Sequence, residues 1–120
     1  MKKILVIEDV EMNRDLIVQL LEEDYAIVEA VDGLQGLALA ETERPDLILT
    51  DLSLPKLDGW ALVARIRAME ALRDVPIIAV TAHAMAGDDR RALKAGCNAY
   101  LTKPIDVEEL YAKVQRLLGD

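Results

Sequence analysis

Short apolar runs alternate with longer amphipathic stretches five times along this chain. The runs span residues 3–7, 26–31, 46–50, 76–80 and 99–102. Near-continuous Ile, Val and Leu are typical of strands that are buried on both faces of a parallel sheet. The second run alternates apolar with polar residues, which favours a strand at the edge of the sheet. The pattern therefore predicts five strands, with 26–31 at an edge.

The stretches between the runs repeat apolar residues at helical spacing, which predicts five helices. Asp106 is a candidate N-cap for the last helix, and Gly96 is placed to end the fourth, at 90–95. Strand–helix alternation of this kind predicts an α/β doubly wound sheet with right-handed crossovers. The stripes that we expect to face the core are Met12, Leu16 and Leu20 with Ile17 and Leu21; Leu34, Leu37 and Ala38; Leu62, Ile66 and Met69; and Val107, Leu110, Tyr111, Val114, Leu117 and Leu118.

Polar residues follow four of the apolar runs directly. Glu8 and Asp9 follow the first run, Asp51 the third, Thr81 the fourth and Lys103 the fifth. In an open α/β sheet the carboxyl ends of the strands meet at one edge, which is where ligands bind. Three carboxylates, one hydroxyl and one ammonium at a single edge suggest a divalent cation and a phosphoryl group.

The chemistry of these groups is mutually consistent. An aspartate can attack a phosphoryl group and form an aspartyl phosphate, and a divalent cation relieves the repulsion between the two anions. Mg²⁺ prefers oxygen ligands, whereas zinc would need His and Cys, of which the chain has one each, far apart in sequence. Taken one at a time, each of these residues also has an ordinary structural role: an acid can begin a helix, a threonine can end a strand, and a lysine can lie at the solvated surface. Their joint occurrence at four strand ends favours a site.

Composition narrows the class of protein. The chain of 120 residues has the size of one domain, and 52% hydrophobic residues with no Phe predict an aliphatic core. A net charge of −8 disfavours direct binding to nucleic acid or anionic membranes. No apolar stretch approaches the ~20 residues that span a bilayer. The single Cys97 permits no intrachain disulfide, so we expect a buried apolar cysteine and a cytoplasmic protein.

The ordered motifs resemble the receiver domain of two-component response regulators over essentially the whole chain, 1–120. The matching stretches are 4–9, 45–55 with 58–59, 76–82 and 96–104. The resemblance implies a flavodoxin-like five-stranded parallel sheet of order 2-1-3-4-5, with the site between strands one and three. The stretch 81–88 is similar to receivers that occur alone or fused to hybrid histidine kinases.

The resemblance also implies a phosphorylation chemistry. Asp51 would accept a phosphoryl group from a histidine kinase or a histidine phosphotransferase. Glu8, Asp9 and Asp51 would hold Mg²⁺, with Mn²⁺ as a possible substitute and the backbone carbonyl of Ser53 completing the protein ligands. Asp9 would bind the metal directly and Glu8 often through water. Such a protein is not an enzyme beyond its own phosphorylation and slow autodephosphorylation.

The remaining implied roles concern signalling. Thr81 would contact the phosphoryl group and move, Tyr100 would turn inward as the aromatic switch, and Lys103 would complete the active site. The 103–104 bond is expected to be cis, which X–Pro bonds permit. Ser53 and His83 would flank the hydrolytic water, although His83 also suits a loop side chain. A downstream protein target would bind the switched surface.

Other interpretations remain. A flavodoxin-like enzyme or electron carrier would need a phosphate loop after the first strand, where 8–11 is acidic instead. Gly33 and Gly36 are wrongly placed for a dinucleotide motif, and an Asp-x-Asp phosphatase would want an acid where Ser53 stands. The chain could also be a receiver domain excised from a hybrid histidine kinase or larger regulator, although Met1 and the short end favour a stand-alone protein.

Overall fold

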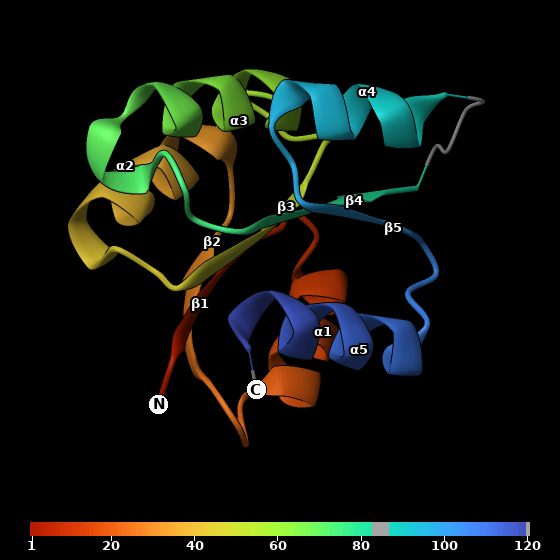
Figure 1. Cartoon of the computed structure of the whole chain (residues 1–120). Helices are drawn as coiled ribbons and strands as arrows, with labels where there is room; N and C mark the ends of the chain where they lie inside the picture. The colour runs from red at the N-terminus through yellow and green to blue at the C-terminus, as the bar shows by residue number, and fades with distance from the viewer. Residues whose placement is uncertain (83–86, 120) are drawn as a thin grey trace.

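A computed structural model describes residues 1–82 and 87–119 of the chain. It contains β1 (Lys3–Ile7), β2 (Ala26–Ala30), β3 (Leu47–Asp51), β4 (Ile77–Thr81) and β5 (Ala99–Thr102). All neighbouring strands are parallel, and their order is β2-β1-β3-β4-β5 (Figure 1). The predicted fold class and strand order are confirmed, including the edge position of β2.

Helices cover both faces of the sheet. They are α1 (Glu11–Leu21), α2 (Gly33–Glu43), α3 (Gly59–Ala68), α4 (Asp88–Ala95) and α5 (Val107–Leu118). A 3-10 turn at Glu70–Leu72, η1, was not predicted. In Figure 1, α2, α3 and α4 lie above the sheet and α1 and α5 lie below it. This is the doubly wound arrangement that strand–helix alternation predicts.

The core is aliphatic and has two layers, one on each face of the sheet. Side chains of β1 alternate between them: Leu5 and Ile7 face α2 and α3, whereas Ile4 and Val6 face α1 and α5. The central strands are buried on both faces, as their near-continuous apolar sequence predicts. Cys97 is buried in the first layer, and burial raises the pKa of its thiol to about 11, so the prediction of an inert buried cysteine is confirmed.

The predicted buried stripe of α1 is confirmed at Ile17 and Leu21 and wrong at Met12 and Leu16. Met12 and Leu16 are 80% and 50% exposed, whereas Ile17 and Leu21 are buried. The helix carries apolar residues on two adjacent lines, and a period of 3.6 residues does not decide which line meets the sheet. Packing against β1 selects the line with the β-branched Ile17.

The predicted stripe of α2 is confirmed at Leu37, which packs against the first core layer, and wrong at Leu34 and Ala38. Leu34 is 51% exposed and Ala38 is exposed, whereas Gly33, Gly36 and Ala40 are buried. The helix approaches β1 so closely that a Cβ on Gly36 would lie 2.6 Å from Cδ1 of Ile7. Small residues thus mark the inner face of this helix, which hydrophobic periodicity does not detect.

The predicted helix ends are confirmed. The Asp106 carboxylate accepts a hydrogen bond of 3.1 Å from the Glu109 amide, which caps α5. Gly96 ends α4 with φ 114°, in the left-handed region that favours glycine. On α5 the predicted stripe is buried at Leu110, Val114 and Leu118, while Val107 and Tyr111 are 40% and 37% exposed.

Candidate functional site

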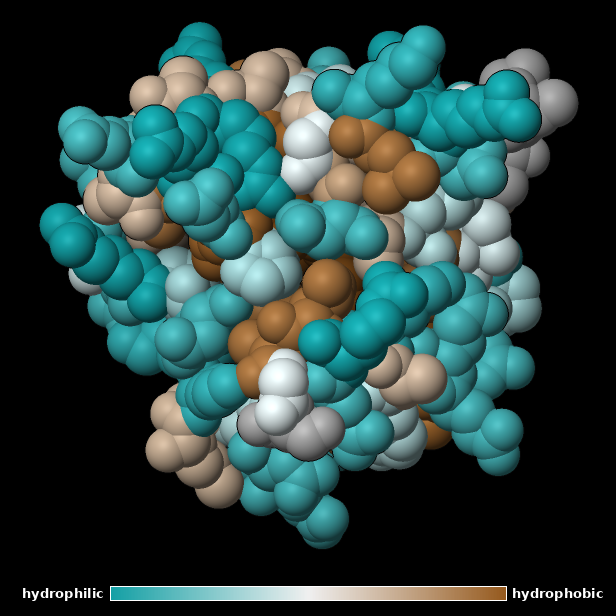
Figure 2. Space-filling model, viewed as in Figure 1, coloured by the Kyte–Doolittle hydropathy of each residue, from teal (hydrophilic) through white to brown (hydrophobic). Residues whose placement is uncertain are grey.

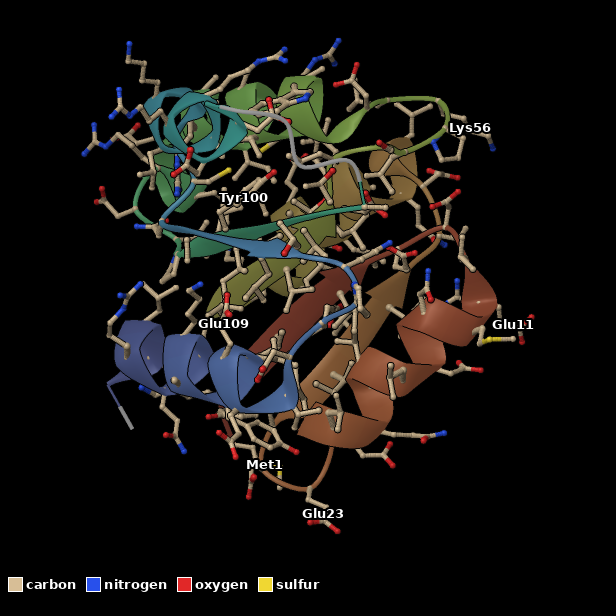
Figure 3. All side chains as sticks on the ribbon, turned by 90° about the vertical axis from the view of Figure 1, so that its right-hand side faces the viewer. Met1, Glu11, Glu23, Lys56, Tyr100 and Glu109 are labelled. Atoms are coloured by element: carbon tan, nitrogen blue, oxygen red, sulfur yellow. The ribbon has the colours of Figure 1, made fainter. Side chains whose placement is uncertain are left out.

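The carboxyl edge of the sheet gathers three acidic side chains. Parallel pairing of β1 with β3 places Ile7 beside Thr50, so the residues that follow, Glu8 and Asp51, are neighbours. One carboxylate oxygen from each of Glu8, Asp9 and Asp51 lies within 4.8 Å of the others. In Figure 3 the labelled Glu11 and Lys56 lie at this edge of the molecule. The structure thus brings together the acids that the sequence placed at two different strand ends.

Lys103 reaches the same point from the end of β5. Its Nζ donates to Oδ2 of Asp51 at 2.7 Å and to Oε1 and Oε2 of Glu8 at 3.0 and 3.1 Å. Its backbone amide donates to the Thr81 carbonyl at 2.8 Å, which ties the loop to β4. The side chain is only 16% exposed, so Lys103 is not a solvated surface lysine. The Lys103–Pro104 bond is cis, as expected.

Burial makes the electrostatics of this edge unusual. Glu8 is 1% exposed. Its desolvation and the adjacent Asp51 raise its pKa to about 7, although Lys103 partly opposes the shift. Burial alone would lower the pKa of Lys103, but its hydrogen bonds to Asp51 and Glu8 outweigh that effect and raise it. Three acids and one lysine leave excess negative charge at the edge, which suits a cation.

Thr81 and Ser53 lie on either side of Asp51. Asp51 ends β3 and pairs with Val80, so Thr81, the last residue of β4, lies next to it and is 4% exposed. The Ser53 amide donates to Oδ1 of Asp51 at 2.9 Å and fixes that carboxylate. The strands β3 and β4 therefore include Asp51 and Thr81, one residue beyond the predicted ends. The role of the Ser53 carbonyl stays a prediction, and His83 lies outside the described residues.

Tyr100 lies on β5 between α4 and α5 (Figure 3). Its hydroxyl oxygen is buried and has no hydrogen-bond partner in the described part of the chain. Burial raises the pKa of this phenol, and the acidic Asp88 and Asp89 add to the shift. The Tyr100 hydroxyl therefore does not lie at the surface, and the switch role of Tyr100 stays a prediction.

Two glycines hold the loops of the site together, and the sequence analysis missed them. A Cβ on Gly59 would lie 2.4 Å from the Asp51 carbonyl oxygen, and one on Gly33 would lie 1.7 Å from the Leu57 carbonyl oxygen. Each glycine stands at the first position of a helix, directly after an aspartate cap. The available signal was an Asp-Gly pair at two helix starts, of which the pair 58–59 entered the sequence analysis only as part of the family resemblance.

A hollow opens beside Lys103, between α1 and the loop that follows β5. It is lined by Asn13, Leu16, Lys103, Pro104 and Ile105. Asn13 donates to Oε1 of Glu8 at 3.2 Å, so the hollow adjoins the acidic site. The sequence analysis did not select Asn13, because a single amide on a helix carries no distinctive signal.

The donor set decides which ion fits. Glu8, Asp9 and Asp51 offer oxygen atoms only, which is the chemistry that Mg²⁺ and Mn²⁺ prefer. The acids stand at the topological switch point, where β1 lies between β2 and β3. Fold and site together define the class of receiver domains. The sequence model of the response regulator receiver domain family matches residues 4–115, and the chain belongs to this family.

Individual proteins and solved structures that are similar to this chain are also response regulators or receiver domains. The polar-differentiation response regulator DivK of Brucella anthropi is 40% identical, with 99% of this chain and 98% of the relative aligned. The receiver domain of the Pseudomonas aeruginosa sensor histidine kinase PA1611, solved with magnesium coordinated in the active-site cleft, has a TM-score of 0.91, 42% identity and coverage of 99% and 98%. A chain in the complex of the Saccharomyces cerevisiae histidine phosphotransfer protein Ypd1 with the Ssk1 receiver has a TM-score of 0.89, 29% identity and coverage of 97% and 88%.

Within residues 1–82 and 87–119, every helix is too short or too polar to cross a membrane.

Proposed function

We propose that the chain, over residues 1–120, is a response regulator receiver whose Asp51 accepts a phosphoryl group from a phosphohistidine. The partner would be a histidine kinase or a histidine phosphotransferase, which the Ypd1 complex of a similar fold supports. The observation that carries the proposal is the position of Asp51, grouped with two further acids and 2.7 Å from the Lys103 ammonium.

Glu8, Asp9 and Asp51, with the Ser53 backbone carbonyl, would hold Mg²⁺, and Mn²⁺ could replace it. Magnesium in the cleft of the PA1611 receiver supports this assignment. A bound divalent cation supplies the positive charge that lets a carboxylate approach a phosphoryl group. Asp9, which is exposed, would bind the ion directly, and the buried Glu8 would act through water.

In the transfer itself, an Asp51 carboxylate oxygen attacks phosphorus while the phosphorus–nitrogen bond to the donor imidazole breaks. The electron pair of that bond stays on the imidazole, so no proton needs to leave the aspartate. Lys103 is placed to balance the charge on the phosphoryl oxygens as a point charge. In hydrolysis, a water oxygen attacks phosphorus while the phosphorus–oxygen bond to Asp51 breaks, which gives inorganic phosphate and restores the Asp51 carboxylate. The chain would thus act on its own phosphoryl group rather than as an enzyme on other substrates.

The phosphoryl group then switches a surface. It adds roughly two negative charges and three acceptor oxygens, which favour movement of Thr81 toward Asp51. Tyr100, whose hydroxyl has no hydrogen-bond partner in the described part of the chain, loses little by changing position. Differential stabilisation by a few kcal/mol is enough to change which state predominates. A downstream protein would recognise the new surface.

We also propose that the chain acts in the cytoplasm as a stand-alone response regulator. A single reduced cysteine fits that compartment. DivK, a relative that aligns over almost its whole length, supports the stand-alone form. A receiver excised from a hybrid histidine kinase would have the same site, as the PA1611 similarity indicates.

Phosphotransfer from radiolabelled phosphohistidine proteins tests the proposal. The histidine kinases and phosphotransferases of the source cell are labelled one by one and mixed with the wild-type chain or with Asp51→Asn. At least one donor should transfer its label within seconds to the wild type and leave Asp51→Asn unlabelled. Equal labelling of both proteins would contradict the assignment of Asp51.

A further inference from the structure

The turn that starts α2 contacts both halves of the acidic edge. We call residues 30–35, at this turn, the α2 anchor, and residues 52–58, between β3 and α3, the β3–α3 loop. On one side, the Glu8 amide donates to the first carbonyl of the α2 anchor at 3.1 Å. On the other side, the Gly33 amide of the anchor donates to the Pro55 carbonyl of the loop at 3.4 Å. The α2 anchor therefore joins two segments that the proposed metal site uses.

Reciprocal hydrogen bonds stabilise the α2 anchor. The Asp32 carboxylate accepts from the Gln35 amide at 2.7 Å, and the Gln35 side chain accepts from the Val31 amide at 2.7 Å. This exchange resembles a capping box, which fixes the first turn of a helix. A contact with the α2 anchor therefore restrains the segment that makes it.

Lys56 lies where the β3–α3 loop meets the α2 anchor (Figure 3), with its Nζ 3.5 Å from Oδ2 of Asp32. Its two chain neighbours touch the anchor as well. Pro55 accepts from the Gly33 amide, and the Leu57 carbonyl oxygen occupies the space that a Cβ on Gly33 would need. Lys56 itself has φ 67°, in the left-handed region that residues with side chains rarely adopt. The surrounding contacts must therefore hold the loop in this conformation.

The ion pair between Lys56 and Asp32 is shielded from water on one side. Hydrophilic side chains make up most of the face in Figure 2, and an ion pair on such a surface usually contributes little. Here the Asp32 side chain is only 12% exposed, although that of Lys56 is 65% exposed. The Gln35 amide and, after it, Lys56 lower the pKa of Asp32 against the opposing effect of burial, so its carboxylate stays ionised. The contact is therefore more than a fully solvated pair.

We propose that the Lys56–Asp32 ion pair is a positioning element for cation binding, which fixes the β3–α3 loop to the α2 anchor. The loop carries Ser53, whose amide donates to Oδ1 of Asp51 at 2.9 Å. Lys56 and Asp32 act through the loop and not as ligands. A loop that is already in place needs no further ordering when the cation binds, which raises affinity. The proposal rests on the proposed function, because that function assigns the Ser53 carbonyl to the cation.

The affinity for Mg²⁺, measured by isothermal titration calorimetry, tests the proposal. Lys56→Met removes the ammonium, whereas Asp32→Asn removes a charge and keeps an oxygen that can accept from the Gln35 amide. Each substitution should weaken Mg²⁺ binding by about threefold, as expected of a partly exposed ion pair. The double variant should bind no more weakly than either single variant, because both substitutions remove the same contact.

The sign of the Lys56→Met effect separates positioning from simple electrostatics. Removing a positive charge near three acids favours a cation by Coulomb attraction alone, so a lysine without a positioning role would give tighter binding when replaced. Tighter or unchanged Mg²⁺ binding by Lys56→Met would therefore overturn the proposal.

Amide hydrogen exchange, followed by NMR in the metal-free protein, gives a second readout. The Leu57 and Gly59 amides donate to the carbonyls of Pro55 and Leu52, at 2.8 and 3.0 Å, and so report on the loop. Both amides should exchange faster in Lys56→Met than in the wild type. Unchanged exchange at both would show that the ion pair does not fix the loop.

Lys3→Met is the matched control, because Lys3 forms a comparable ion pair where β1 begins, at the opposite edge of the sheet. Its Nζ lies 3.3 Å from Oε1 of Glu43, and the two side chains are 35% and 40% exposed. Lys3→Met should bind Mg²⁺ no more weakly than the wild type. Weakening equal to that of Lys56→Met would reveal a general effect and overturn the proposal. Circular dichroism is measured on every variant.

The same proteins separate this proposal from the proposed function. A wild type that neither binds Mg²⁺ nor becomes phosphorylated on Asp51 would contradict the proposed function, and this proposal with it. Normal Mg²⁺ binding and Asp51 labelling of the wild type, with equal Mg²⁺ affinity in Lys56→Met, would contradict the positioning role alone.

Discussion

Glu8 is an acidic residue whose side chain is almost completely shielded from water. It is buried, touches Lys103 at 3.0 Å and receives a further hydrogen bond from Asn13 at 3.2 Å. The Lys103 ammonium is shared between Glu8 and Asp51 and satisfies one carboxylate oxygen of Asp51. Protonation of Glu8 or binding of a cation stabilises this side chain, because either reduces its electrostatic repulsion with Asp51.

This environment predicts an unusual pH dependence of stability in the absence of metal. Because burial and Asp51 raise the pKa of Glu8 from 4.5 to about 7, the folded protein keeps a proton that the unfolded chain releases between those values. The free energy of unfolding should therefore fall as pH rises from about 4.5 to about 7, by up to about 3 kcal/mol. Urea denaturation in a chelating buffer measures this loss.

Glu8→Gln is the control for the pH experiment. The amide keeps the shape of the side chain and cannot ionise, so the part of the slope due to Glu8 should disappear. Other carboxyl groups titrate in both proteins and cancel in the comparison. An identical fall in the wild type and in Glu8→Gln would mean that Glu8 ionises at its ordinary pKa in the folded protein.

At the scale of elements, β3 and α3 are joined by close backbone packing as well as by the side chains of the first core layer. Gly59→Ala should destabilise the protein by about 1–3 kcal/mol, because the new Cβ meets the backbone of Asp51 and Leu52 at 2.4 and 2.5 Å. Thermal unfolding measures the change. Ala64→Gly, at an exposed position of α3, provides the comparison, with a loss of about 1 kcal/mol from helix propensity alone. A stabilised Gly59→Ala variant would contradict the packing account.

Arg67 on α3 ties three further segments together. Its guanidinium donates to the carbonyls of Val75, Arg73 and Gly96 at 2.6, 3.0 and 2.7 Å, and to the Asn98 side chain at 2.9 Å. Arg67→Lys should lower stability by about 2–3 kcal/mol, because one ammonium cannot satisfy acceptors in so many directions. Denaturant titration checks this value. A loss below about 0.5 kcal/mol would show that water replaces these bonds freely.

At the scale of elements, the sequence predicts the strands and several site residues, but it does not predict which face of each helix packs against the sheet. Strand positions and order follow from buried aliphatic runs, and Asp51, Thr81 and Lys103 follow from their places at the strand ends. The inner faces of α1 and α2 were predicted only in part, because Met12 and Leu34 fit a helical stripe as well as the residues that face the core do. Only the close approach of Gly36 to Ile7 selects the other line, and that distance is a property of the packed structure. The buried Tyr100 hydroxyl and the contacts of Arg67 likewise depend on segments that are distant in sequence.

At the scale of the whole molecule, the fold concentrates negative charge where a cation can offset it. A ligand that binds only the folded protein stabilises it by mass action, by about 2.7 kcal/mol at a hundred times its dissociation constant. Mg²⁺ should therefore raise the melting temperature of the wild type, and Asp9→Asn should respond much less. Glu11→Gln removes a nearby charge outside the acidic trio and should respond like the wild type. Equal Mg²⁺ responses in all three proteins would argue against this site.

The most direct measurement is peptide mapping by mass spectrometry after incubation with phosphoramidate. With Mg²⁺ present, one phosphoryl group should appear on the peptide that contains Asp51. Its yield should drop sharply when a chelator replaces the metal. A phosphoryl group on another residue, or the same yield on Asp51 without any divalent cation, would contradict the view that the acids at this edge prepare one aspartate for phosphorylation.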